Sequence, residues 1–161
     1  MNFFSILSQI RASDSSTAPA TAVGAATTSD DSKKHLGDIT QHAGILLKTL
    51  RPGDITNYPQ KGDRCTIHYD AYTEDDLYGG SENPVPFDSS RKRRQAFCFR
   101  LGENQVIEGL DVAVSKMSLG EEIEATIPFP YAYGVAGYPP VVPPRATLIF
   151  RVELLQISSS A

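Results

Sequence analysis

One uncharged stretch limits the folds open to this chain: Pro128-Phe-Pro-Tyr-Ala-Tyr-Gly-Val-Ala-Gly-Tyr-Pro-Pro-Val-Val-Pro-Pro144. Each proline lacks an amide donor and fixes one backbone dihedral angle, so no helix can run through the stretch. A membrane-spanning helix is therefore excluded despite the apolar length. What remains is a long loop, bent at Gly134 and Gly137, whose tyrosines and valines must cover or bind something.

Apolar patterns on both sides of this loop predict β-strands. Residues 146–157 form the longest candidate strand after the loop, and residues 123–127 form another directly before it. Further upstream, apolar residues alternate through 64–72 and 97–101, and a short apolar run occupies 45–50. Alternation at every second position indicates a strand with one buried face.

The only convincing helix is expected at about residues 108–117. Its apolar residues recur at three- and four-residue steps, at Leu110, Ala113, Val114 and Met117. Strands outnumber helices and are joined mostly by turns. The sequence therefore predicts an α+β fold, a twisted antiparallel sheet of five to six strands wrapped around one short α-helix.

The composition excludes several classes of function. The 161 residues carry a formal charge of -4 without a large basic field, so we expect neither nucleic acid nor membrane as a partner of the chain as a whole. There is no Gly-rich phosphate loop, nucleophile elbow or metal-ligand spacing of Cys and His, so no metal and no cofactor are expected. Cys65 and Cys98 are interpreted as reduced core residues. Small molecules or peptides remain as ligands.

Both ends of the chain are predicted to be tails. Residues 1–40 are predicted to be disordered because 12–34 are mostly Ala, Ser, Thr, Gly and Asp. The apolar run within 1–13 follows no Lys or Arg, so it makes a poor secretory signal, and organellar targeting stays an alternative. The domain itself is expected at 41–158, followed by a tail at 159–161. We expect a monomer, since no heptad pattern is present. The expected location is the cytoplasm.

Four polar features have simple interpretations. His68 is expected to be a solvent-facing strand residue, and the acidic segment 74–86 an exposed excursion. The basic run 91–94 is interpreted as a solvated bend, with an import signal or anion-contact patch as the alternative. Asp88 either caps a local turn or orients hydroxyls such as those of Tyr69 and Tyr133.

Aromatic residues gather at positions that the strands or the loop could turn to one side: Tyr69, Phe87, Phe97, Phe99, Tyr133, Tyr138 and Phe150. The simplest interpretation is a hydrophobic core. Together with Val106, Ile107, Leu110, Val141 and Val142, however, they exceed what one short helix would cover. Part of this set is therefore a candidate for the lining of a concave apolar pocket.

Six motifs in order make the chain resemble the FKBP family, the tacrolimus-binding peptidyl-prolyl cis-trans isomerases. The resemblance runs from about Gly44 to Ile157. Its motifs are Ile-His-Tyr at 67–69, Phe-Asp-Ser-Ser-Arg at 87–91, Val-Ile-Glu-Gly at 106–109, Met-Ser-Leu-Gly at 117–120, Tyr-Ala-Tyr-Gly at 131–134, and Val-Val-Pro-Pro at 141–144 before Ala-Thr-Leu-Ile-Phe.

This resemblance implies a proline-binding pocket lined by Tyr69, Phe87, Asp88, Phe97, Phe99, Val106, Ile107, Tyr133, Val142 and Phe150. Among them, the residues expected to act in catalysis are Tyr69, Asp88, Phe99, Tyr133 and Phe150. Arg93 falls where the family has an arginine that supports the Asp88 and tyrosine hydroxyls. Tyr138 and Val141 lie on the overhanging loop. The Ile107 amide and the Tyr133 hydroxyl would donate to ligand carbonyls.

The resemblance also implies the function and its alternative. A family member accelerates rotation about Xaa-Pro bonds in client proteins, assists folding, and binds tacrolimus- or rapamycin-type macrolides. In this chain Leu110 stands where the family's best catalysts have a tryptophan, and the excursion 74–86 is longer than in the family. The alternative is a weakly active or inactive peptide-binding or chaperone module of the same fold. A nuclear or ribosome-associated role through residues 91–94 is a third hypothesis.

Overall fold

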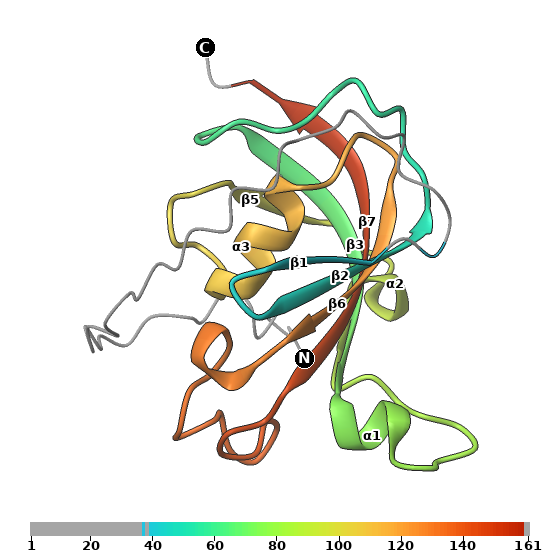
Figure 1. Cartoon of the computed structure of the whole chain (residues 1–161), viewed down its shortest axis with the longest axis vertical. Coiled ribbons are helices and arrows are strands. Elements are labelled where there is room, and N and C mark those ends of the chain that lie inside the picture. The colour runs from blue at the N-terminus through green and yellow to red at the C-terminus, as the bar shows by residue number, and fades with distance from the viewer. Residues whose placement is uncertain (1–36, 38, 160–161) are drawn as a thin grey trace.

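The computed structural model describes residue 37 and residues 39–159. Within them, one seven-stranded antiparallel sheet has the order β1-β2-β6-β7-β3-β4, and β5 also pairs with β3. The twisted sheet curves around helix α3 (Figure 1). The predicted fold class is thus confirmed, with seven strands in place of five to six. The predicted disordered segment 12–34 and the targeting segment 1–13 lie outside the described residues.

Seven strands and three short helices make up the described chain. The strands are β1 (Ile39–His42), β2 (Ile45–Arg51), β3 (Arg64–Thr73), β4 (Asp88–Ser89), β5 (Phe97–Arg100), β6 (Glu122–Ile127) and β7 (Leu148–Ser158). The helices are α1 (Glu74–Tyr78), α2 (Ser90–Arg93) and α3 (Glu108–Ser115), with a 3₁₀ turn at Phe129–Tyr131. None of these helices is long and apolar enough to span a membrane.

The central strand β3 shows why the sheet has one buried face. It pairs with β7 in a register that sets Tyr69 opposite Val152 and Ala71 opposite Phe150. All four of these residues are fully buried, whereas Asp70, which alternates with them, is only partly covered. Because side chains alternate across a strand, the inner face packs the core and the outer face carries polar groups.

Helix α3 fills the concave side of the sheet. Leu110, Ala113 and Val114 are fully buried, and a fully buried leucine contributes about 1.5–3 kcal/mol relative to an exposed one. A Cβ atom on Gly109 would overlap the side chain of Ile127 on β6. Glycine at this position therefore lets the helix approach the sheet closely. The helix ends at Ser115, two residues earlier than predicted.

Two short helices and two short strands were not predicted. Helix α1 lies within the acidic excursion, which is mostly exposed as expected, and begins where Thr73 Oγ1 accepts a hydrogen bond from Asp76 N at 3.1 Å. Helix α2 begins where Ser89 Oγ accepts from Lys92 N at 3.1 Å. Strand β1 is exposed at every position and β4 has two residues. None of these segments is long enough to show a buried periodicity.

Three local predictions are wrong. The basic run 91–94 is not a solvated bend, because it forms most of α2 and the helix cap. His68 does not simply face solvent: it is partly buried and its Nδ1 lies 2.9 Å from Ser90 Oγ. Cys98 is exposed, whereas Cys65 is buried as predicted and both thiols are free. Burial raises the pKa of Cys65 to about 12, so its thiol stays protonated.

Candidate functional site

Four aromatic rings from three neighbouring strands form a continuous cluster on the inner face of the sheet. The rings of Phe97 and Phe99 on β5 stack with centroids 6.0 Å apart. Phe97 meets Tyr69 of β3 edge to face at 6.0 Å, and Tyr69 lies 6.0 Å from Phe150 of β7. Offset and edge-to-face pairs of this kind are favourable aromatic geometries. We call Tyr69, Phe97, Phe99 and Phe150 the aromatic cluster.

A largely buried polar triad of Tyr69, Asp88 and Arg93 borders the aromatic cluster. The Tyr69 hydroxyl donates to Asp88 Oδ2 at 2.7 Å, and Arg93 Nη2 donates to the same hydroxyl at 3.0 Å. Arg93 Nη1 also pairs with Asp88 Oδ1. Of the two interpretations of Asp88, hydroxyl orientation therefore holds for Tyr69, whereas the local cap comes from Ser89. A charged pair around a buried hydroxyl fixes the tilt of the Tyr69 ring.

Tyr133 presents the most unusual polar atom of the site. Its hydroxyl is buried, and it has no hydrogen-bond partner among the residues that the structure describes. Burial raises the pKa of Tyr133, and the nearby Asp88 carboxylate and Tyr69 raise it further, so the group is a neutral donor. A buried donor without an acceptor costs about 1–3 kcal/mol. A ligand oxygen placed here would remove that cost.

Two backbone hydrogen bonds join the two sides of the loop between β6 and β7. Tyr138 N donates to Val142 O at 2.8 Å, and Val142 N donates to Tyr138 O at 2.8 Å. Gly137, at φ +66°, lies so close to the Val142 and Pro143 carbonyls that a side chain there would overlap them. The closed loop buries Val142 and exposes 36% of Tyr138 and 38% of Val141. The Tyr138 ring packs against Tyr133 at 5.8 Å.

The fourteen predicted site residues divide by burial. Those that are buried are Tyr69, Asp88, Phe99, Val106, Ile107, Leu110, Val142 and Phe150. Partly exposed residues are Phe87, Arg93, Phe97 and Tyr133, whereas Tyr138 and Val141 are exposed. A ligand would therefore meet the second and third groups first. Ile107 directly precedes α3, where backbone N–H groups have no partner within the helix.

Sequence reasoning missed Ser90. It is fully buried, and its hydroxyl accepts a hydrogen bond from Tyr69 N at 2.7 Å. The Ser90 hydroxyl thereby supplies the acceptor that a neighbouring strand would otherwise offer to Tyr69 N. The pair Ser89-Ser90 before a basic run was the available signal, because serine is a preferred residue at helix starts. Within 37 and 39–159, no group of three His, Cys, Asp or Glu residues gathers as a metal site.

The antiparallel sheet wrapped around α3, with aromatic rings and the polar triad on its inner face, defines an FKBP-like domain. A sequence model described as FKBP-type peptidyl-prolyl cis-trans isomerase matches residues 56–155. The chain therefore belongs to this family and is a peptidyl-prolyl cis-trans isomerase, as the sequence predicted.

Individual relatives agree with this assignment. FK506-binding protein 1 of Kluyveromyces lactis is 46% identical over 119 residues, which cover 74% of this chain and 97% of the relative. FK506-binding protein 1 of Yarrowia lipolytica is 47% identical over 115 residues, 71% of this chain and 99% of the relative. Among solved structures, FkpA from Escherichia coli matches with a TM-score of 0.65 and 29% identity. That match covers 80% of this chain and only 55% of FkpA.

Proposed function

We propose that this isomerase binds Xaa-Pro segments of client proteins against the aromatic cluster and thereby assists their folding. The observation that carries the proposal is the buried Tyr133 hydroxyl, a donor without a partner among the described residues. Its electrostatic neighbours include Asp88 and Tyr69, so the unused donor and the aromatic cluster share one site. A peptide carbonyl is the kind of acceptor that such a donor lacks.

A binding site alone is sufficient for this reaction. Rotation about an Xaa-Pro bond has a barrier of about 18–20 kcal/mol because the planar amide is resonance-stabilised. No covalent bond breaks. At the top of the barrier the amide is twisted and less charge-separated, so an apolar, water-poor environment favours it over the planar state. An acceleration of about 10⁴ requires about 5.5 kcal/mol, which differential binding of the twisted state can supply.

Each proposed role follows from position. Tyr69, Phe99 and Phe150 pack the prolyl ring, with Phe97 and Phe87 at the accessible rim. Tyr133 O–H and Ile107 N–H hold the carbonyls that flank the proline. Asp88 and Arg93 keep the Tyr69 ring in one orientation. Val106, Leu110 and Val142 support the site from below, and Tyr138 and Val141 contact the substrate from the closed loop.

We also propose that the same site binds macrolides of the tacrolimus and rapamycin type. Two relatives that match most of this chain are named for binding FK506. A macrolide carbonyl would take the place of the peptide carbonyl at Tyr133. Because Leu110 provides no flat aromatic ring beneath the ligand, we expect weaker macrolide binding than in a family member that has tryptophan there.

Leu110 also favours the second candidate function, a peptide-binding module of the same fold with little turnover. Protease-coupled isomerisation of a Leu-Pro test peptide by the full chain separates the two. Turnover that tacrolimus abolishes, and that falls in a Tyr133→Phe variant, supports catalysis at the proposed site. A folded protein that binds the peptide without accelerating its isomerisation would instead support the module.

Domain limits, location and oligomeric state are further proposals. We propose an isomerase domain that ends at residue 158 and begins at residue 39, two residues before the predicted boundary at 41, with the residues before it and 159–161 as tails, and a monomer in the cytoplasm. The sheet runs from β1 at residue 39 to the end of β7 at residue 158. Free Cys65 and Cys98 suit a reducing compartment. Limited proteolysis, sedimentation and cell fractionation test the three proposals in turn.

A further inference from the structure

Through two arginines, helix α2 contacts strand β3 on both faces of the sheet. Arg91 and Arg93 are two residues apart on this single turn, and side chains at that spacing do not share a helix face. Arg93 reaches the inner face, where it contacts Asp88 and the Tyr69 hydroxyl. Arg91 reaches the outer face, where it lies 3.6 Å from Asp70. One turn of helix therefore joins the site to the opposite side of the sheet.

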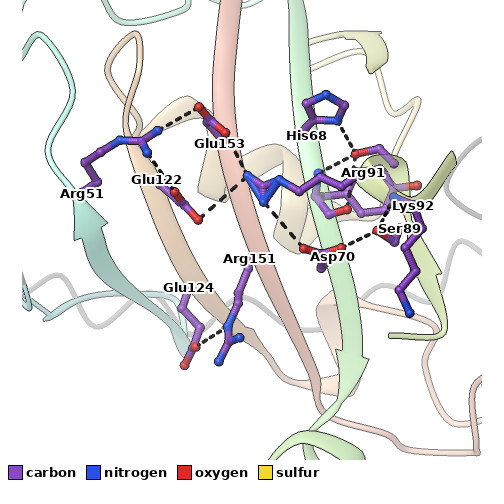
Figure 2. A network of polar contacts seen from close by, with 12 residues as sticks. Arg51, His68, Asp70, Ser89, Arg91, Lys92, Glu122, Glu124, Arg151 and Glu153 are labelled. Carbon is purple, nitrogen blue, oxygen red and sulfur yellow. Dashed lines mark hydrogen bonds and ion pairs between the residues drawn. The ribbon is translucent and has the colours of Figure 1, made fainter. Parts of the chain in front are cut away.

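Arg91 is the centre of an ion-pair network on the outer face (Figure 2). Its Nη2 donates to Glu153 Oε2 of β7 at 2.9 Å and lies 3.9 Å from Glu122 Oε1 of β6. Its Nη1 faces Asp70 Oδ2 of β3. The four side chains are between 19% and 33% exposed, so water screens them only in part. Arg91 thereby ties α2 to three neighbouring strands.

Asp70 connects this network to the start of α2. Its Oδ1 accepts a hydrogen bond from Ser89 Oγ, and the same Ser89 Oγ caps the helix by accepting from Lys92 N. Asp70 therefore contacts both the capping residue Ser89 and Arg91. A helix of one turn is not stable by itself, because nucleation costs more than its few hydrogen bonds return. The orientation of α2 must therefore come from contacts of this kind.

We propose that Arg91 is a positioning residue for isomerisation. Its ion pairs with Asp70, Glu122 and Glu153 lie on the outer face of the sheet, opposite the aromatic cluster. It fixes α2 on the outer face so that Arg93 meets Asp88 and Tyr69 on the inner face. The inference rests on the proposed function, because it assigns Arg91 an effect on catalysis only through the role proposed for Arg93.

Arg51 provides a matched control. It pairs with the same two glutamates as Arg91, Glu153 at 2.8 Å and Glu122 at 3.3 Å, but it lies on β2 and not on α2. Arg51→Met and Arg91→Met both remove an arginine from one network, and we expect both to lower the unfolding midpoint. Only Arg91→Met should lower kcat/KM for a Leu-Pro peptide, by about three- to tenfold, since small misplacements of a site are costly.

A double-mutant cycle tests how Arg91 acts. Arg93→Met alone should lower kcat/KM, and adding Arg91→Met to it should lower kcat/KM no further. Arg91→Lys should recover part of the loss, because a lysine keeps one charge near Glu153. Full additivity of the two losses, or equal losses of kcat/KM in Arg91→Met and Arg51→Met, would overturn the inference.

The cycle also separates this inference from the proposed function. If Arg93→Met leaves kcat/KM unchanged, the role proposed for Arg93 fails, and the inference fails with it. If Arg93→Met lowers kcat/KM and Arg91→Met does not, only the inference fails. Should Arg91→Met not fold, Arg91→Gln takes its place, because it removes the charge that pairs with Glu153 and Asp70 but keeps a polar side chain. A wild-type kcat/KM in folded Arg91→Gln would likewise overturn the inference.

Discussion

Tyr69 donates its hydroxyl to Asp88 at 2.7 Å, whereas the hydroxyl of Tyr133, within electrostatic reach of the same carboxylate, is buried without a partner among the described residues. Two chemically identical groups therefore have different roles. The first belongs to a finished network that holds the fold. The second is a buried donor, and we propose that a ligand carbonyl pairs with it.

Substitution by phenylalanine should separate these two tyrosines. Tyr133→Phe should leave the free energy of unfolding unchanged or raise it by up to about 1 kcal/mol, because it removes an unsatisfied group. Its kcat/KM should fall about tenfold, the effect of losing about 1.4 kcal/mol from the twisted state. Tyr69→Phe should instead lower the free energy of unfolding by about 1–3 kcal/mol, since Asp88 and Arg93 lose a shared partner.

Urea unfolding and the protease-coupled assay measure the two quantities. Equal losses of stability in both tyrosine variants would show that the Tyr133 hydroxyl has a partner in solution.

Phe99→Leu should reduce catalysis more than it reduces stability. Phe99 stacks on Phe97 within the aromatic cluster, so leucine removes a flat wall from the proposed prolyl site while keeping much of the apolar volume. We expect the free energy of unfolding to fall by about 1 kcal/mol and kcat/KM to fall severalfold. Phe129→Leu is the control, because Phe129 is partly buried outside the aromatic cluster. A folded Phe99→Leu protein with the wild-type rate would refute the assignment.

The buried thiol of Cys65 should make stability depend on alkaline pH. Burial raises its pKa from 9.0 to about 12, so above pH 9 the unfolded chain loses this proton while the folded chain keeps it. The folded state then binds more protons, and stability falls as the pH rises towards about 12. Cys65→Val should make this fall less steep in urea titrations at several pH values. An unchanged slope would contradict the burial of the thiol.

Thiol labelling gives an independent check on the same pair of cysteines. Cys98 is exposed and should react with a thiol reagent in the native protein, whereas Cys65 should react only after denaturation. Cys98→Ser should therefore remove all rapid labelling of the native chain. Rapid labelling that persists in this variant would place Cys65 at the surface.

Gly109→Ala should weaken the packing of α3 on the sheet. The added Cβ would overlap the Ile127 side chain, and overpacking of this kind costs about 1–3 kcal/mol. Ile127→Ala should remove the obstacle, so the double variant should lose less free energy of unfolding than the sum of the single variants. Strict additivity in urea unfolding would show that the two residues do not meet.

Strand alternation predicted most of the sheet because one of its faces is buried. In β3 and β7 the residues opposite each other, such as Tyr69 and Val152, are buried and adjoin partly exposed neighbours. Helix α3 was predictable for the same reason. Strand β1 and helices α1 and α2 lack a buried face long enough to show a period, so only their caps, such as Ser89, could have indicated them.

The polar contacts of the site were less predictable. Sequence order gave no indication that Arg91 would meet Glu153, 62 residues away, on the far side of the sheet. The pairing of Arg93 with Asp88 was expected only from the resemblance to a family. That the Tyr133 hydroxyl has no partner within 37 and 39–159 depends on every neighbouring atom, and no local pattern encodes such a property.

The two edges of the sheet differ in their exposure to other chains. At one end of the strand order, two short strands border β3: β5 with four residues, and β4 with two residues before the chain turns into α2. At the other end, β1 is exposed at all four positions. An unpaired strand edge is a template for strand addition by a second molecule. Aggregation of this protein under mild destabilisation should therefore begin at β1, and a proline in place of Gln41, whose N–H points away from β2, would be a way to suppress it.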